Sequence, residues 1–424
     1  VCSVSNSSHA VYACLVCGKY FAGRGPSSVA YKHSIHQDHH VFINLQDAKV
    51  YVLPDNYLVS DSSLQDIISV LKPTFKKSSV DLAAVRYDLT GKAFQPGFIG
   101  LNNIKANDYQ NVVYMALAHI TPLRDFFLFQ KDVTNGVSSK DPNSTVELAS
   151  RFRLLVRKLW NTCAFKAQVS PHELVQQVTK DSRKRFEMTK KGDPVGFVSW
   201  FLNALHGGVR GPAGSIVQDL FQGGVKIESQ QIIGMTAHGA QFDPERAITS
   251  QALPFFVLSL DLPPIPLFQD ELESNIIPQI SLSTLFHQKY NRNMCFEDTG
   301  MLKRYTLTRH PRYMILYFRR FKRVKGGAIE FNPTVVNFGS TMEFGGAVDG
   351  QSRKYRLTAN ICVVDGLAGP TTASYKVYLL NKSDEQKAWK EVMDLYVGEA
   401  AWEMISLQTS YIQFWERCDL ALSY

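Results

Sequence analysis

Residues 97–128 read GFIGLNNIKANDYQNVVYMALAHITPLRDFFL, the pattern of a tight turn that leads into a helix. Gly100 and the asparagines after it favour a turn, and either Asn107 or Asp108 is a good helix N-cap. The apolar residues that follow give the helix a buried face, and Pro122 is expected to end it.

The turn delivers one side chain to the N-terminus of this helix, and that side chain is Asp108. Because the helix dipole lowers the pKa of a thiol at such a position, the geometry suits a cysteine nucleophile. A carboxylate can cap the helix but cannot perform thiolate chemistry. The pattern therefore predicts a position that suits a nucleophile, but the residue at that position, Asp108, is not a thiol.

The stretch resembles the cysteine box of the ubiquitin-specific proteases, Gly-Leu-x-Asn-Leu-Gly-Asn-Thr-Cys-Tyr-Met-Asn. Residues that match this pattern or replace it conservatively are Gly100, Leu101, Asn103, Ile104, Tyr109 and Asn111. Residues 105–108, Lys-Ala-Asn-Asp, replace Gly-Asn-Thr-Cys. Further blocks of the family follow in order, so the resemblance implies an α+β, papain-like fold with thumb, palm and fingers over residues 97–424.

The resemblance also assigns the other catalytic positions. Ser374 stands in the place of the family's histidine, Met393 in that of its first aspartate, and Asn103 in that of the oxyanion donor. Neither a hydroxyl nor a thioether takes up a proton near neutral pH, so neither can activate a nucleophile. We therefore expect a pseudo-deubiquitinase without catalytic residues. A residual hydrolase with an improvised nucleophile is the alternative.

The first 75 residues contain a CxxC pair and four histidines between positions 33 and 40. Two thiolates and two imidazoles make a closed tetrahedral zinc site, which stabilises a small unit and leaves no position open for chemistry. The segment resembles the UBP-type zinc finger. This resemblance implies four ligands, with His36 and His40 as spare histidines, and the ligands are Cys14, Cys17, His33 and His39.

The same resemblance has two further consequences. Other members carry additional zinc ligands where this chain has Ala22 and Val29, so it implies a single structural Zn²⁺. Arg24 and Tyr51 stand where ubiquitin-binding members hold a free carboxylate, but Leu53 replaces a second aromatic residue. Ubiquitin binding is therefore not expected.

These patterns divide the chain into three parts. Residues 1–75 are predicted to form the zinc finger, 76–96 a linker, and 97–424 the protease-like domain that has lost its triad.

Composition limits the partners and the compartment. The formal charge of +8 and the pI near 9.0 favour acidic partners. The seven cysteines are an odd number, scattered apart from one CxxC, which favours a reducing compartment. No apolar run reaches the roughly 20 residues that a membrane span needs, so no membrane partner is expected.

Residues 309–325 hold seven Lys/Arg and no acid, which makes them the best candidate for a basic patch. If they form an alternating strand, one face is strongly positive, and Arg319, Arg320 and Lys322 are predicted to contribute to partner docking. The alternative is a half-buried strand flanked by solvated cations. RNA contact through such a face would involve phosphates without sequence-specific readout. A second basic run, residues 180–193, ends in a turn.

A UBP-type finger joined to a protease fold without its triad resembles inactive family members that act in the spliceosome, and the string NNIKANDY carries this resemblance most specifically. It implies a nuclear, non-enzymatic role in pre-mRNA splicing. That role would support assembly or stability of the U4/U6.U5 tri-snRNP through contacts with spliceosomal proteins. The alternative is a ubiquitin or ubiquitin-like protein binder that uses the inactive cleft.

Overall fold

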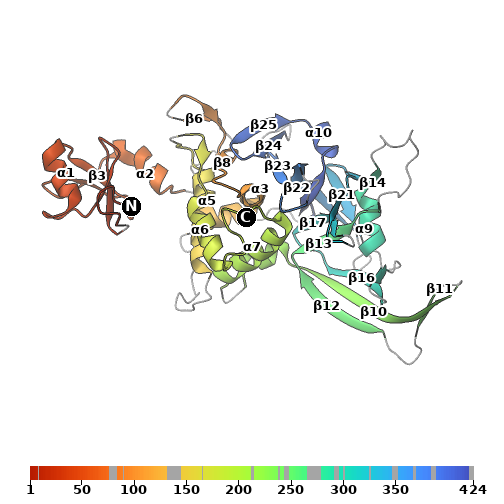
Figure 1. Ribbon diagram of the computed structural model, residues 1–424. Helices are drawn as coiled ribbons and strands as arrows, with labels where there is room; N and C mark the ends of the chain where they lie inside the picture. Colours follow the sequence, from red (N-terminus) through yellow and green to blue (C-terminus); the bar gives the residue numbers. More distant parts are fainter. Residues whose placement is uncertain are drawn as a thin grey trace. The chain divides into compact units, whose positions relative to one another are not determined.

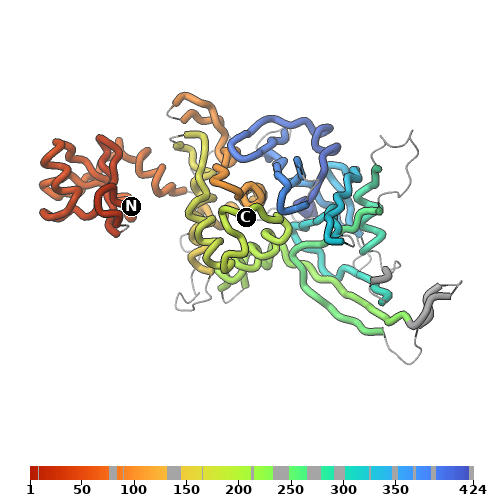
Figure 2. Tube along the Cα trace, viewed as in Figure 1, coloured from red at the N-terminus to blue at the C-terminus, as the bar shows by residue number. Residues whose placement is uncertain are grey.

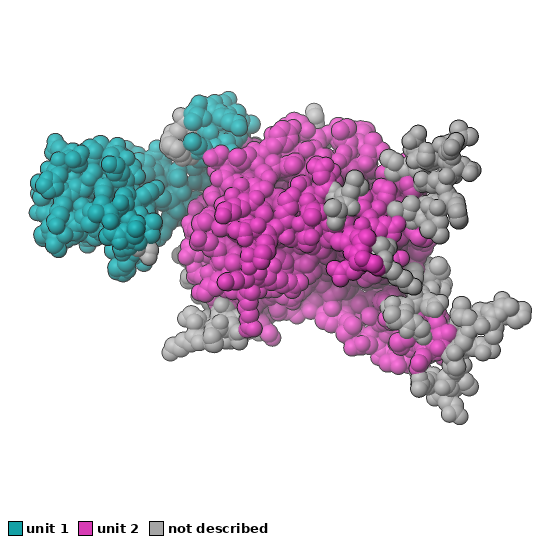
Figure 3. Space-filling view, in the orientation of Figure 1, with its two compact units in different colours: residues 1–81, 85–94, 160–167 teal, residues 82–84, 95–159, 168–424 magenta. Residues whose placement is uncertain are grey.

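The computed structural model describes most of the chain. The described residues are 1–7, 9–75, 84–88, 90–130, 145–164, 166–211, 214–236, 239–242, 248–264, 278–290, 296–298, 301–323, 326–345, 352–365, 369–382 and 388–419. They divide into two compact units, drawn in different colours in Figure 3. Unit 1 comprises Val1–Asp81, Val85–Phe94 and Trp160–Ala167, and unit 2 comprises the rest.

Unit 1 is built on a small antiparallel sheet in the order β2-β1-β3-β4-β5. Its strands are β1 (Val11–Cys14), β2 (Tyr20–Ala22), β3 (Val41–Asn44), β4 (Val50–Val52) and β5 (Tyr57–Val59). Helix α1 (Val29–Gln37) begins at Ser28, whose hydroxyl accepts the backbone N–H of Tyr31, and covers one face of the sheet with Ala30.

The other face of the sheet is covered by a short 3₁₀ turn, η1 (Ser62–Leu64), and helix α2 (Gln65–Leu71). Leu64, Ile68 and Leu71 pack against Ile43 and Val50. Because α2 turns this apolar side to the sheet, its opposite side, with Ile67 and Val70, remains partly exposed.

The compact units differ from the predicted domains at two places. Part of the predicted linker, 76–83 and 89, lies outside the described residues, but its remainder forms a hairpin of β6 (Arg86–Tyr87) and β7 (Ala93–Phe94) within unit 1. Residues 160–167, predicted to belong to the protease-like domain, also fall in unit 1. The reason is a pair of hydrogen bonds: Asn161 Nδ2 donates to the Ser69 carbonyl at 3.0 Å, and the Ala167 N–H donates to Asp88 Oδ2 at 3.0 Å.

Unit 2 contains a helical region and two sheets (Figure 1). The helices are α3 (Asp108–Ala118), α4 (Thr121–Phe129), α5 (Val146–Leu159), α6 (His172–Asp181), α7 (Pro194–Gly208) and α8 (Ile216–Phe221). Every residue of α3 is buried, so this helix is the core of the region. The sequence predicts that Pro122 ends α3, and this prediction is wrong. Pro122 lies in the first turn of α4, where proline's missing N–H has no helical partner to lose.

The main sheet of unit 2 has eight strands in the order β13-β17-β26-β22-β23-β24-β25, with β21 paired to β22. The strands are β13 (Val257–Asp261), β17 (Tyr313–Arg319), β21 (Thr341–Phe344), β22 (Arg353–Asp365), β23 (Ser374–Leu380), β24 (Trp389–Met393), β25 (Tyr396–Ala400) and β26 (Ser410–Arg417). Helices α9 (Leu282–Tyr290) and α10 (Trp402–Ser406) flank it. A core of aromatic and aliphatic residues around Trp415, Phe344 and Tyr355 fills its inner side.

A second sheet projects from unit 2 as a long ribbon (Figure 1). Its strands are β10 (Gly223–Thr236), β11 (Gly239–Phe242), β12 (Thr249–Phe255), β15 (Phe296–Asp298) and β16 (Met301–Arg309). The ladder between β10 and β16 runs from Gly224 to Gln231 and holds the ribbon together. Residues 216–221, which precede this sheet, form α8 because the Ser215 hydroxyl caps a helix there.

Four short pairs complete the fold: β8 (Gly100–Leu101) with β9 (Gln168–Val169), β14 (Gln279–Ser281) with β20 (Val335–Asn337), β18 (Phe321–Arg323) with β19 (Ile329–Phe331), and β6 with β7. The mixture of helices and largely antiparallel sheets confirms the predicted α+β class. Among the described helices none alone is long and apolar enough to cross a bilayer; only α3 and α4 together, bent by 86°, meet the length and hydropathy test.

Candidate functional site

The four predicted zinc ligands lie together in unit 1. Their ligand atoms are all within 4.8 Å of one another, although the residues come from a strand end, a turn, a helix and the loop after it. Cys17 Sγ is 3.4 Å from His33 Nε2, which is 3.2 Å from His39 Nδ1. Bond lengths of about 2.3 Å to sulfur and 2.0–2.1 Å to nitrogen place tetrahedral ligands roughly 3.6 Å apart for S···N and 3.3 Å for N···N. The residues therefore fit Zn²⁺ closely.

The chemistry of the donors agrees with this geometry. Burial and the neighbouring His39 lower the pKa of His33, so its imidazole is neutral and free to donate a lone pair. The Cys14 thiol is buried, which raises its pKa, and zinc binding has to release that proton. With all four positions filled by protein, the metal would tie the finger together and offer no open site.

The spare histidines behave as expected. His36 is exposed, and His40 lies 2.7 Å from both the Leu53 carbonyl and Asp38 Oδ1. Ala22 and Val29 contribute no ligand, and within the described ranges only one cluster of this kind is found.

The first predicted catalytic position lies at the N-terminus of α3. Asn107 occupies the N-cap, and Asp108 is the first helical residue, so of the two predicted caps Asn107 takes the position. The Asp108 side chain is 5% exposed, and its Oδ1 has no hydrogen-bond partner. Burial therefore raises the pKa of this carboxyl, because the charged form is poorly solvated.

An asparagine network joins the turn before α3 to the end of β24. Asn103 Nδ2 donates to Asp394 Oδ2 at 3.0 Å, and Asn111 Nδ2 donates to Asp394 Oδ1 at 3.1 Å. Asn107 Nδ2 in turn donates to Asn111 Oδ1 at 3.0 Å. Asn103, placed by sequence in the oxyanion position, thus directs its amide to Asp394.

Lys191 occupies the neighbourhood of Ser374, and sequence reasoning did not predict this. Its ammonium lies 3.1 Å from Ser374 Oγ, and 3.3 and 3.4 Å from the carbonyls of Thr372 and Ala373. The positive charge also lowers the pKa of Asp108, opposing the larger effect of burial. Met393 ends β24 and supplies no group that could orient a base.

The segment before α7 is packed onto this region. The backbone N–H of Ala106 donates to the Met188 carbonyl at 3.1 Å. Gly192 approaches the Tyr109 ring so closely that a Cβ there would lie 2.7 Å from Cζ, so only glycine fits. The described residues around Asp108 thus include a buried carboxylate, an ammonium and amides, and the three predicted triad positions carry neither the thiolate nor the imidazole that acyl transfer requires.

Comparison with known proteins follows the same division of the chain. A family profile described as "Ubiquitin carboxyl-terminal hydrolase" matches residues 99–415, and one described as "Zn-finger in ubiquitin-hydrolases and other protein" matches residues 2–64. The chain belongs to the ubiquitin carboxyl-terminal hydrolase family.

Individual relatives match over nearly the whole chain. "Probable mRNA-splicing protein ubp10" of Schizosaccharomyces pombe is 42% identical over 98% of this chain and 85% of its own length. "Ubiquitin carboxyl-terminal hydrolase 39" of Homo sapiens is 42% identical over 99% of this chain and 77% of its own length. A solved structure entitled "Crystal structure of an essential yeast splicing factor" superposes with a TM-score of 0.76 at 27% identity, covering 99% of this chain and 95% of that one.

The finger of this ubiquitin carboxyl-terminal hydrolase family member keeps Arg24 and Tyr51 in contact. The Arg24 guanidinium lies 4.2 Å above the centre of the Tyr51 ring, and its Nη1 donates to Asn56 Oδ1 at 2.8 Å. Leu53 is fully buried. Arg24 is therefore held by contacts within its own chain.

One of the three residues predicted to contribute to partner docking is not on the surface. Arg320 is fully buried, because it follows the end of β17 in a turn and points inward. Its guanidinium donates to the carbonyls of Ser410, Asn332 and Thr334 at 2.6, 2.9 and 2.8 Å. Arg319 and Lys322 are exposed, but Arg319 pairs with Asp261 at 3.1 Å. The strand therefore offers much less free positive charge than its sequence suggests.

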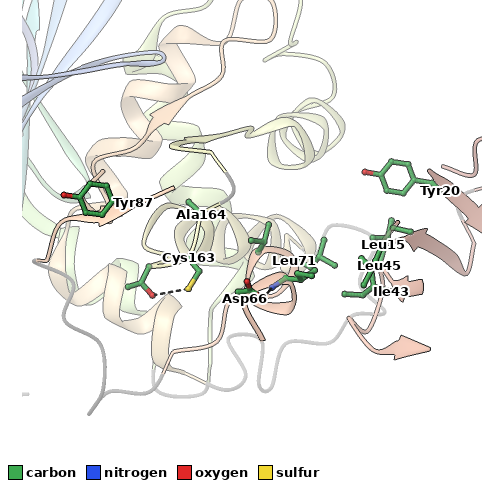
Figure 4. A pocket seen from close by; sticks show the side chains of 13 residues that line it. Leu15, Tyr20, Ile43, Leu45, Asp66, Leu71, Tyr87, Cys163 and Ala164 are labelled. Atoms are coloured by element: carbon green, nitrogen blue, oxygen red, sulfur yellow. Dashed lines mark hydrogen bonds between the residues drawn. The ribbon is translucent and has the colours of Figure 1, made fainter. Parts of the chain in front are cut away.

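Unit 1 also contains an apolar pocket of about 400 Å³ (Figure 4). Leu71 and Asp66 of α2 line it together with Ile43 of the finger sheet and Cys163 of the 160–167 segment. Its walls would accept a hydrophobic side chain, and none of the four zinc ligands lines it.

Proposed function

We propose that this chain is a non-enzymatic pre-mRNA splicing factor that acts in the nucleus and supports assembly or stability of the U4/U6.U5 tri-snRNP through contacts with spliceosomal proteins. The names of one relative, the probable mRNA-splicing protein ubp10, and of one solved structure, an essential yeast splicing factor, support the splicing role, since both match almost all of this chain.

The observation that carries the non-enzymatic part of the proposal is the chemistry at Asp108, Ser374 and Met393. A cysteine protease needs a thiolate, an imidazole within hydrogen-bond reach of it and a group that orients the imidazole. Here the buried carboxylate of Asp108 replaces the thiolate, and the Ser374 hydroxyl, which is bonded to Lys191, replaces the imidazole. The Met393 thioether replaces the group that orients the imidazole, and each of these three replacements alone would lower the rate by orders of magnitude.

The role is tested in nuclear extract depleted of its own relative of this protein. Adding the purified chain should restore co-sedimentation of U4, U5 and U6 snRNA in one particle and restore splicing of a reporter transcript. The Cys17→Ser variant should lose the folded finger, and the Asp108→Asn variant should keep it. Comparing the two variants shows whether particle assembly depends on the folded finger or on the chemistry of the Asp108 carboxylate. The proposal fails if the wild-type chain leaves the snRNA particles unchanged.

The alternative, a binder of ubiquitin or a ubiquitin-like protein, is measured in the same preparation. Titration with ubiquitin should give no saturable signal, and a ubiquitin probe that labels active-site thiols should leave the chain unmodified. Micromolar ubiquitin binding that is lost on Arg24→Ala, with no effect on snRNA particles, would replace the proposed role with the alternative.

A further inference from the structure

A strongly basic segment, residues 180–191, leads from the end of α6 to the start of α7 (Figure 2). It contains six Lys/Arg and two acids. All six cations are exposed: Lys180, Arg183, Lys184, Arg185, Lys190 and Lys191. The segment therefore concentrates more accessible positive charge than the strand predicted to dock partners, whose central arginine is buried.

Three of these cations are engaged by neighbouring groups: Lys190 pairs with Glu187 at 3.3 Å, Lys191 is bonded to Ser374, and Arg185 lies over the Phe186 ring at 5.0 Å. The other three, Lys180, Arg183 and Lys184, have no carboxylate at ion-pair distance in the described parts of the chain. Of these, Arg183 and Lys184 directly follow Ser182, the C-cap of α6.

The backbone at these two residues is unusual. Arg183 has φ of 52° and Lys184 has φ of 64°, both in the left-handed region. The Lys184 N–H donates to the Thr179 carbonyl at 2.8 Å, and the Arg183 N–H donates to the Lys180 carbonyl at 3.1 Å. These bonds close the C-terminus of α6 in the manner of a helix end at which glycine is the common residue.

Folding does not account for this choice of residues. Long side chains in the left-handed region cost free energy that glycine avoids and asparagine reduces. A helix C-terminus does attract cations, but Lys180 already supplies one in the last turn of α6. Arg183 and Lys184 are thus retained against the preference of their own backbone, a pattern found at functional positions.

The surroundings favour a phosphate backbone over a protein surface. Protein partners dock on buried apolar anchors, yet residues 180–191 themselves include none of the large hydrophobic side chains that are exposed on the described chain. An arginine fork and a lysine ammonium projecting into solvent match the spaced oxygens of phosphodiesters. We propose that Arg183 and Lys184, supported by the other cations of residues 180–191, bind the phosphodiester backbone of RNA without reading bases. The choice of RNA as the nucleic acid rests on the proposed splicing function.

The test measures binding of the full chain to fluorescent single-stranded RNA of mixed sequence by anisotropy, over a range of salt concentrations. The variant is Arg183→Gly with Lys184→Gly. Losing two phosphate contacts should lower the slope of log K against log salt by about 1.4 and weaken binding roughly 25-fold at 0.1 M salt. The melting temperature should stay the same or rise, because glycine suits the left-handed backbone.

A matched control removes the same charge elsewhere in unit 2. Lys322→Ala with Arg323→Ala deletes two exposed cations of β18 and should leave affinity and salt slope within about twofold of wild type. Arg183→Asn with Lys184→Asn, which also tolerates the left-handed backbone, should reproduce the loss seen with glycine.

Three results would overturn the proposal: unchanged RNA affinity in the double-glycine variant, an equal loss in the β18 control, or displacement of RNA by poly-glutamate of equal charge at equal concentration. The last would assign the segment to an acidic protein partner. Failure of the splicing role is a separate outcome, since it appears as unchanged snRNA particles while RNA binding by the purified chain persists.

Discussion

Arg320 provides a sharp test of how unit 2 is held together. Its guanidinium is fully buried at the end of β17 and donates to three backbone carbonyls, one on β26 and two in the segment before β20. No carboxylate lies against it, so the positive charge is balanced by carbonyl dipoles alone within the described surroundings. Replacing it with methionine keeps most of the volume and removes all three bonds.

The size of the effect follows from these contacts. Hydrogen bonds to a charged group contribute about 1.5–3 kcal/mol each, which gives roughly 4.5–9 kcal/mol for three. Burial opposes this, since it lowers the pKa of Arg320 from 12.5 to about 10, equivalent to roughly 3 kcal/mol of lost solvation. The net loss expected for Arg320→Met is therefore about 1–6 kcal/mol, centred near 3 kcal/mol.

The assay is denaturant unfolding of the full chain, with tryptophan fluorescence reporting on Trp415 of β26, which is fully buried. The Lys322→Met variant is the control, because Lys322 is exposed and should change stability by less than about 0.5 kcal/mol. An Arg320→Met loss below about 0.5 kcal/mol, or one equal to the control, would refute the reasoning that these carbonyls depend on the guanidinium.

Three further predictions concern the two candidate sites. Metal analysis should find one zinc per chain, and Cys17→Ser should remove it and unfold unit 1 while unit 2 keeps its own unfolding transition; zero zinc, or two, would contradict the assignment. Burial raises the folded-state pKa of Asp108, so the folded chain holds that proton more tightly, and stability falls as pH rises from the unfolded pKa of about 3.9 through the folded one. Asp108→Asn should therefore raise the melting temperature more at pH 7 than at pH 4, and an equal rise at both would argue against a strained carboxylate. Neither wild type nor Asp108→Cys should hydrolyse a fluorogenic ubiquitin ester. Adding Ser374→His to Asp108→Cys should raise the hydrolysis rate roughly 10²–10⁴-fold if the imidazole displaces Lys191. Hydrolysis by wild type that disappears in Asp108→Ala would instead show that Asp108 acts as an improvised nucleophile.

Local patterns in the sequence were sufficient wherever the site is held by short-range geometry. The CxxC turn and the histidine spacing predict all four zinc ligands, because the finger brings together residues only 3 to 25 positions apart. The turn at Gly100 and the asparagines after it likewise predict the N-terminus of α3 to within a residue.

Longer-range contacts could not be predicted from these patterns. Lys191 reaches Ser374 across 183 positions of sequence, and a lysine in a basic run gives no sign of such a partner. The density of positive charge alone predicts that Arg319, Arg320 and Lys322 share a face, but consecutive residues of an extended chain point to opposite sides. Arg319 at the end of β17 is exposed, and Arg320, the next residue, is buried. Residues 160–167 changed units for a similar reason, since Asn161 and Ala167 bond to residues 92 and 79 positions earlier.

The asparagine contacts hold the turn before α3, and α3 itself, against the end of β24. Each asparagine that frames the nucleophile position now joins two elements: Asn103 and Asn111 tie the turn and α3 to Asp394, beside which the Leu101 N–H donates to the Asp394 carbonyl at 2.9 Å. Asn111 is buried, Asp394 is half-buried and Asn103 is exposed. Breaking the Asn111–Asp394 bond would therefore leave a buried amide without this partner, at a cost of about 1–3 kcal/mol, whereas the exposed Asn103 amide would exchange its partner for water. Asn111 thus contributes most to holding α3 against the end of β24.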